Sequence, residues 1–135
     1  SNFKVPEDGY YSVTMNSITK TVKIEKLEIT PAAYNKIGLI GAMNDWNGDV
    51  EFKPFQTENN HAWYVEYTFA SSSQCKIRAN GGWDYNWGTK SGFDGDASFS
   101  AIGVGTQGGK NMLQEAGTYI VIFNDIDGFY RFIKK

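Results

Sequence analysis

Two short segments of the sequence place a tryptophan next to polar side chains. In Ile40–Asn47, an apolar stretch ends in a polar loop that carries Trp46. In Cys75–Trp83, an alternating stretch ends in a Gly-Gly turn that is followed by Trp83. The C–H-rich face of a sugar ring packs well on a flat aromatic side chain, with a gain in dispersion and desolvation energy. Both segments therefore have the residue types that a carbohydrate site requires.

Hydrogen-bonding side chains accompany the second tryptophan. Lys76 supplies a mobile ammonium group, Arg78 a rigid fork of donors, and Asn80 both a donor and an acceptor. Two indole rings set at an angle would suit the curved path of an α-1,4-linked glucan, whereas a flat chain such as cellulose would prefer coplanar rings. We therefore expect a glycan-binding site that comprises Trp46, Lys76, Arg78, Asn80 and Trp83, with no metal and no cofactor.

A structural role is the alternative for each of these residues. Arg78 could brace the loop, Lys76 could be a solvated strand residue, and Asn80 could serve only as a turn former. Two other side chains, Trp63 and Cys75, are expected inside, whereas Trp87 is ambiguous. Trp63 lies on the apolar face of a regular alternation and Cys75 on an inward position, while Trp87 could fold under the loop.

Several classes of function are excluded by composition. The formal net charge is −2, so the basic surface that nucleic acid requires is missing. A single cysteine leaves no intramolecular disulfide and no cysteine-based metal site. The carboxylates fall mainly in turns and strand edges, which argues against a glycosidase, and Asp94-Gly95-Asp96 lacks the spacing of a calcium loop. We expect a protein that is not an enzyme.

Alternation with a period of two recurs along the chain and predicts an all-β protein. It is clearest in Ala62–Phe69, and turn signals such as Asn47-Gly48, Gly81-Gly82 and Asp127-Gly128 separate the apolar stretches. This pattern favours an immunoglobulin-like antiparallel β-sandwich with an N-terminal β-hairpin. The predicted strands are Tyr10–Met15, Thr21–Ile29, Lys36–Ile40, Glu51–Phe55, Ala62–Phe69, Gln74–Asn80, Thr118–Phe123 and Phe129–Ile133, while Ser91–Gly109 is expected to be a long loop with one short strand near Ala97–Ile102.

An internal similarity suggests how the chain is divided. Gly9-Tyr10-Tyr11-Ser12-Val13 aligns with Gly117-Thr118-Tyr119-Ile120-Val121, and the match continues through Asn16 and Asn124. Two explanations of this similarity remain open. Either it reflects a residue pattern common to β-hairpins in general, or residues 1–30 are the closing hairpin of a preceding, similar domain. Residues 31–135 are expected to form the carbohydrate-binding sandwich.

The two tryptophan segments resemble a known family of modules. The motif Gly-x-x-Asn-x-Trp at Gly41–Trp46 is similar to the tryptophan loop of glycogen- and starch-binding modules, and Lys76 keeps its spacing to Trp83. The stretch Ile77–Gly88 and the segment Gly108–Met112 are closer to the starch-binding domains of SusE/SusF-type outer-membrane proteins. The similarity covers about residues 37–135, with Met43, Ile77 and Trp87 as departures from the usual residues.

The resemblance implies a function and a location. It implies non-catalytic binding of starch or another α-glucan by one module of a larger lipoprotein, secreted and anchored at the outer-membrane surface. Such a protein would work beside partner proteins of a glycan-uptake complex, and we expect the module to be monomeric. Some relatives keep the fold without binding starch, so a structural immunoglobulin-like spacer is the alternative. Residues 1–4 do not look like a signal peptide, as in a mature or trimmed protein.

Overall fold

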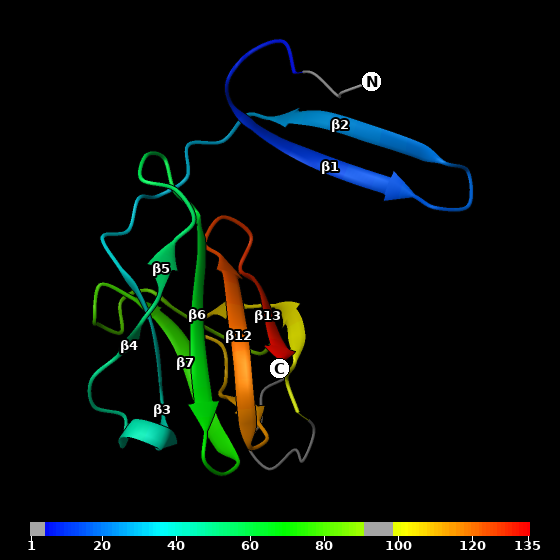
Figure 1. Cartoon of the computed structure of the whole chain (residues 1–135). Coiled ribbons are helices and arrows are strands. Elements are labelled where there is room, and N and C mark those ends of the chain that lie inside the picture. The colour runs from blue at the N-terminus through cyan, green and yellow to red at the C-terminus, as the bar shows by residue number, and fades with distance from the viewer. Residues whose placement is uncertain (1–4, 91–98) are drawn as a thin grey trace. The chain divides into compact units, whose positions relative to one another are not determined.

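The computed structural model (Figure 1) describes residues 5–90 and 99–135. Within these ranges the chain forms thirteen β-strands and one short 3-10 helix, η1 (Ala42–Asn44). All strand pairs are antiparallel. The chain divides into two compact units, Ser1–Pro31 and Ala32–Lys135, which are described separately.

The first unit contains a single hairpin. Strands β1 (Tyr10–Asn16) and β2 (Thr21–Leu27) pair in register from Tyr10 opposite Leu27 to Asn16 opposite Thr21. The Asn16 side chain accepts the backbone N–H groups of Ile18 and Thr19, which fixes the turn.

One sheet of the second unit is built around strand β7. Its strand order is β10-β8-β7-β3-β4, and β11 also pairs with β7. Strand β11 meets β7 at Cys75, whereas β8 meets β7 at Ile77 and Arg78, so the two short strands share one edge. The bounds are β3 (Ile37–Gly41), β4 (Val50–Glu51), β7 (Ser73–Ala79), β8 (Asn86–Gly88), β10 (Thr106–Gln107) and β11 (Met112–Gln114).

The other sheet of the second unit is five-stranded, with the order β5-β6-β12-β13-β9. Figure 1 shows its three long strands, β6, β12 and β13, side by side. The bounds are β5 (Lys53–Pro54), β6 (Ala62–Phe69), β9 (Ile102–Val104), β12 (Gly117–Asn124) and β13 (Phe129–Lys134).

Alternate side chains of the two sheets meet in one hydrophobic core. The ring centroids of Trp87 on β8 and Phe123 on β12 lie 4.9 Å apart, which joins one sheet to the other. Trp63 and Cys75 are buried in this core, as the alternation predicts, and Trp87 is buried too. The fold is therefore an all-β sandwich, which confirms the predicted class; the immunoglobulin-like type stays a prediction.

The main differences from the predicted strands lie in the short elements. The predicted strand Glu51–Phe55 is wrong as a single element, because the chain passes from β4 in one sheet to β5 in the other at buried Phe52. Strands β8, β10 and β11 were not predicted, since two or three residues carry too little pattern. The strand expected near Ala97–Ile102 lies partly outside the described residues, and the structure has β9 at Ile102–Val104.

Residues 5–90 and 99–135 contain no helix that is both long and apolar enough to span a bilayer.

Candidate functional site

The candidate site lies on the outer face of the sheet that contains β7. Ile77 and Ala79 of this strand point into the core, so Lys76 and Arg78 point the opposite way. On the same outer face, Gly38 of β3 and Asn86 of β8 lie on either side of Arg78. Three neighbouring strands therefore supply the floor of the site.

Trp46 follows β3 and is held by a tight loop. Its backbone N–H donates to the Gly41 carbonyl at 2.9 Å, and the Asn44 side chain accepts the Gly41 N–H at 3.0 Å. Asp45 and Trp46 both have a left-handed backbone, with φ of 56° and 55°. Such a conformation is uncommon outside glycine and persists where surrounding contacts enforce it. The loop thus presents the indole ring in a defined position at the end of the strand.

Trp83 lies in the turn between β7 and β8, which is anchored on both sides. The Gly82 N–H donates to the Ala79 carbonyl at 3.2 Å, and the Ala79 N–H donates to the Tyr85 carbonyl at 2.9 Å. The carbonyl of Trp83 itself accepts from the Asn86 side chain at 2.9 Å. Four hydrogen-bonding residues around Trp83 therefore restrict its backbone.

These two loops bring the two indole rings together. The ring centroids of Trp46 and Trp83 are 6.2 Å apart, and the ring planes make an angle of 42°. Trp46 is 36% exposed and Trp83 is 48% exposed, in contrast to the buried Trp63 and Trp87. The pair forms a bent aromatic surface that is open to solvent.

Arg78 lies beneath Trp83 and is itself fixed by a carboxylate. Its guanidinium carbon is 4.7 Å from the centroid of the Trp83 ring, and its Nε donates to Asp49 Oδ1 at 2.8 Å. A cation over an indole ring contributes about 0.5–2 kcal/mol, depending on how far it is desolvated. Arg78 itself is 8% exposed, so it supports the ring from within the protein, while Trp83 stays 48% exposed.

Lys76 is buried beside Arg78 in the same layer. Its ammonium group donates to Asn86 Oδ1 and lies 5.9 Å from the Trp83 ring centroid. Burial lowers the pKa of Lys76, because the charged form loses hydration. Lys76 is therefore not the solvated strand residue considered as an alternative.

Asn80 lies at the edge of the site and has a backbone role. Its side-chain oxygen accepts the N–H groups of Asn35 at 3.0 Å and of Lys36 at 3.4 Å. Its own backbone is left-handed, with φ of 56°, at the turn after β7. These contacts match the turn-forming alternative, and a contact of Asn80 with glycan stays a prediction.

Sequence reasoning missed Asp49 and Asn86, which hold the two cations. The sequence pointed to them only indirectly. Lys76 and Arg78 lie on a strand whose residues are mostly buried, and buried cations need polar partners. Asp49 also borders a depression of about 260 Å³, which neither Trp46 nor Trp83 lines. Its lining residues are Lys36, Ile37, Gly38, Gly48, Asp49, Glu51, Arg78 and Gly81.

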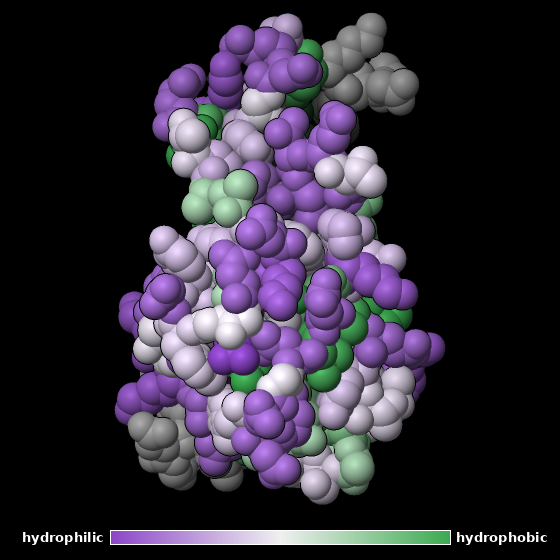
Figure 2. All heavy atoms as spheres, turned by 90° about the vertical axis from the view of Figure 1, so that its left-hand side faces the viewer, coloured by the Kyte–Doolittle hydropathy of each residue, from purple (hydrophilic) through white to green (hydrophobic). Residues whose placement is uncertain are grey.

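The surface on this side of the molecule is mixed in character. Figure 2 faces the side on which η1 and β4 lie in Figure 1, and it shows mostly hydrophilic residues with small hydrophobic patches. Tryptophan ranks as weakly hydrophilic on the scale used there. On this scale a pair of indole rings does not count as hydrophobic, although it offers a flat apolar area.

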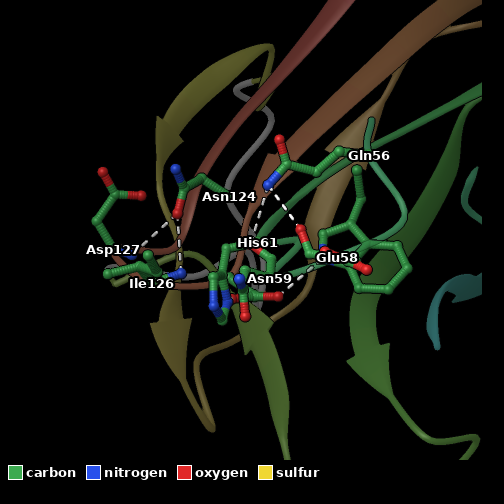
Figure 3. Close-up of polar contacts among 9 residues, drawn as sticks. Gln56, Glu58, Asn59, His61, Asn124, Ile126 and Asp127 are labelled. Atoms are coloured by element: carbon green, nitrogen blue, oxygen red, sulfur yellow. Dashed lines mark hydrogen bonds and ion pairs between the residues drawn. The ribbon is translucent and has the colours of Figure 1, made fainter. Parts of the chain in front are cut away.

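His61 belongs to a separate polar cluster at the start of β6. Its Nδ1 lies 2.7 Å from Asp125 Oδ1, and the Trp63 indole N–H donates to the other oxygen of Asp125 at 2.8 Å. Burial raises the pKa of the Asp125 carboxyl, an effect that the contacts from Trp63 and His61 oppose. The cluster links the turn after β12 to β6. Figure 3 shows His61 together with Asn124, Ile126 and Asp127 of that turn.

No cluster of three or more His, Cys, Asp or Glu side chains suited to a metal ion occurs in residues 5–90 and 99–135. The segment Asp94-Gly95-Asp96, considered for calcium, lies outside the described residues. A scan against protein-family models finds no match to this sequence, and a search of curated proteins finds no significant similarity.

Proposed function

We propose that residues 32–135 form a non-catalytic carbohydrate-binding module whose ligand is a glucose-based polysaccharide, with α-glucan favoured. One observation carries the proposal: the exposed rings of Trp46 and Trp83 lie 6.2 Å apart and are tilted by 42°. A solvent-facing pair of indole rings above a fixed floor of polar side chains is typical of recognition sites, which supports the proposal.

The tilt between the rings supports the choice of an α-glucan. Successive glucose units of an α-1,4-linked chain curve, so two stacked units present their faces at an angle. A pair of rings at 42° follows that curve better than it follows a flat β-1,4-linked chain. Each stacking contact contributes on the order of 1 kcal/mol, so two of them give weak binding that hydroxyl contacts would supplement.

The supporting residues are proposed to act by pre-organisation. Arg78 holds Trp83 from below, and Asp49 holds Arg78, so the ring need not be ordered when the ligand binds. Lys76 and Asn80 are proposed to contribute at the edge of the platform. No bond is broken in this proposal, and no cofactor takes part.

The experiment is calorimetric titration of the chain with maltoheptaose, with cello-oligosaccharide as the linkage control. Binding to maltoheptaose should be weak, saturable and without release of reducing sugar. Trp46→Ala and Trp83→Ala should each lower affinity by about 10-fold or more, which corresponds to about 1.4 kcal/mol. Phe55→Ala is the matched control, because Phe55 is 59% exposed but lies after β5, in the other sheet.

The result that would overturn the proposal is absence of binding to every glycan of an array by protein that is correctly folded. That outcome would favour the alternative function, a structural spacer domain. The contacts of Lys76 with Asn86 and of Arg78 with Asp49 are the observation that favours it, because both cations already have partners within the protein.

The cellular setting follows from the resemblance to SusE/SusF-type domains. We propose that the module belongs to a lipoprotein at the outer-membrane surface and holds polymer beside the partner proteins of a glycan-uptake complex. An immunoglobulin-like connectivity and a monomeric state are part of the same proposal.

A further inference from the structure

The N-terminal hairpin repeats the last hairpin of the sandwich at a constant offset along the sequence. Strand β1 corresponds to β12 and strand β2 to β13. Both hairpins begin with a glycine in the same unusual conformation, Gly9 with φ of 157° and Gly117 with φ of 146°. In both, a tyrosine two residues later lies opposite a lysine of the returning strand: Tyr11 opposite Lys26, and Tyr119 opposite Lys134.

Side-chain contacts at the base of the two hairpins also match. The tyrosine hydroxyl donates to the carbonyl of a glutamate four residues earlier, at 2.8 Å for Tyr11 and Glu7 and at 3.0 Å for Tyr119 and Glu115. The opposing lysine forms an ion pair with that same glutamate: Lys26 with Glu7 at 2.8 Å, and Lys134 with Glu115 at 3.4 Å. None of these contacts is a general requirement of a β-hairpin.

The turns of the two hairpins are closed in the same way. In each, an asparagine side chain at the end of the first strand accepts two backbone N–H groups. The contacts are Ile18 and Thr19 to Asn16, both at 3.0 Å, and Ile126 and Asp127 to Asn124, at 2.8 and 3.4 Å. Figure 3 shows the second set.

The two hairpins differ in what covers their apolar faces. One face of β12–β13 is buried in the core through Tyr119, Val121, Phe123, Tyr130 and Phe132, each at most 4% exposed. The corresponding positions in β1–β2 are also apolar throughout: Tyr11, Val13, Met15, Val22 and Ile24. Yet Val13 is 60% exposed and Met15 is 76% exposed. The first hairpin therefore has apolar side chains of the kind that line a core, but Val13 and Met15 are not covered by one.

We propose that residues 7–27 are the closing hairpin of a second β-sandwich built like that of residues 32–135. A two-stranded hairpin is marginally stable in water by itself, so an apolar face of this kind needs a partner. In residues 32–135, β12 pairs with β6 and β13 pairs with β9. The partner of β1–β2 is therefore a sandwich that lacks its last two strands. Because β12 and β13 come last in their sandwich, that partner precedes residue 7 in the same polypeptide.

Amide hydrogen exchange on two chains tests the proposal. One is the 135-residue chain, and the other is the natural polypeptide extended upstream by the length of one sandwich. Exchange of β1–β2 amides should slow by about 100-fold or more in the longer chain, while that of β12–β13 stays the same in both. In the longer chain, Met15→Ala should speed exchange in β1–β2, whereas Thr14→Ala, on the other face of β1, should not.

Three results would overturn it. Equal exchange of β1–β2 in both chains would show that no upstream sandwich covers the hairpin. Strong protection in the 135-residue chain at all concentrations would show that the hairpin is covered without an upstream partner. Protection that rises with concentration of the 135-residue chain would show that a second copy covers it. Glycan binding enters none of these measurements, so the proposed function can fail independently.

Discussion

Arg78 shows how one side chain serves both structure and recognition. Arg78 carries a charge, yet it is only 8% exposed. The carboxylate of Asp49 and the ring of Trp83 compensate the guanidinium for its lost hydration. Removing one partner of a buried ion pair costs more than the pair contributes, because the remaining charge loses its hydration without compensation. The Nε of Arg78 already donates to Asp49 and so does not serve a ligand hydroxyl. Arg78 is therefore better placed to position Trp83 than to contact the ligand through this atom.

Lys76 permits a prediction about pH. Its pKa in the folded protein is lowered from the ordinary value of 10.5 by burial. Between the lowered pKa and 10.5, the unfolded chain therefore binds more protons at this group than the folded chain does, so stability attributable to Lys76 rises with pH. Lys76→Met removes this dependence. Urea unfolding of both proteins from pH 8 to 11 should show the free energy of unfolding of the wild type rising relative to that of Lys76→Met. A difference between the two free energies that stays constant with pH would contradict the prediction.

At the scale of elements, close backbone packing between strands and loops positions the site. Strand β3 approaches its neighbours at two glycines. A Cβ atom at Gly41 would lie 2.1 Å from the Gln74 carbonyl oxygen, and one at Gly38 would lie 2.5 Å from Asp49 Cβ. Asp49 therefore reaches Arg78 only because residue 38 has no side chain.

Gly38→Ala is expected to weaken glycan binding without touching a tryptophan. The new methyl group should displace Asp49 from Arg78 and so loosen the support under Trp83. We expect a loss of affinity of about 3- to 10-fold and a loss of stability of about 1–3 kcal/mol. Gly82→Ala is the matched control, because nothing lies within 4 Å of a Cβ atom at Gly82. Titration with maltoheptaose and urea unfolding measure the two effects; equal behaviour of both variants would rule out this explanation.

At the scale of the whole molecule, the two units differ in how their apolar residues are used. Residues 32–135 bury aromatic side chains from both sheets in one core, as the contact of Trp87 with Phe123 illustrates. The hairpin of residues 5–31 leaves Val13 and Met15 exposed. The stability of the 135-residue chain should therefore come almost wholly from residues 32–135.

Two substitutions at corresponding positions test that division. Phe123 is 2% exposed and Met15, its counterpart in the first hairpin, is 76% exposed. Phe123→Ala should cost about 3–5 kcal/mol because it leaves a cavity in the core. Met15→Ala should change the stability of the 135-residue chain by less than about 0.5 kcal/mol. Urea unfolding monitored by tryptophan fluorescence measures both, and a cost above 2 kcal/mol for Met15→Ala would contradict the assignment.

The sequence by itself determined the strand class and the long strands, because side-chain alternation with a period of two is a local property. Strand Ala62–Phe69 appears with its predicted bounds, and Trp63 and Cys75 are buried as the alternation requires. The two tryptophan loops could also be recognised from the sequence, as could the internal similarity that aligns Asn16 with Asn124. The short strands β8, β10 and β11 escaped prediction because only their neighbours make them strands.

The tertiary structure alone decided which of those residues meet. Trp46 and Trp83 are far apart in the sequence, and their 6.2 Å separation depends on β3 and β7 pairing with Ile40 opposite Lys76. The pairing of Arg78 with Asp49 likewise depends on a close approach across Gly38. Distances between side chains on different strands are set by sheet register and loop closure, which involve the whole chain at once and leave no trace in any short segment of sequence.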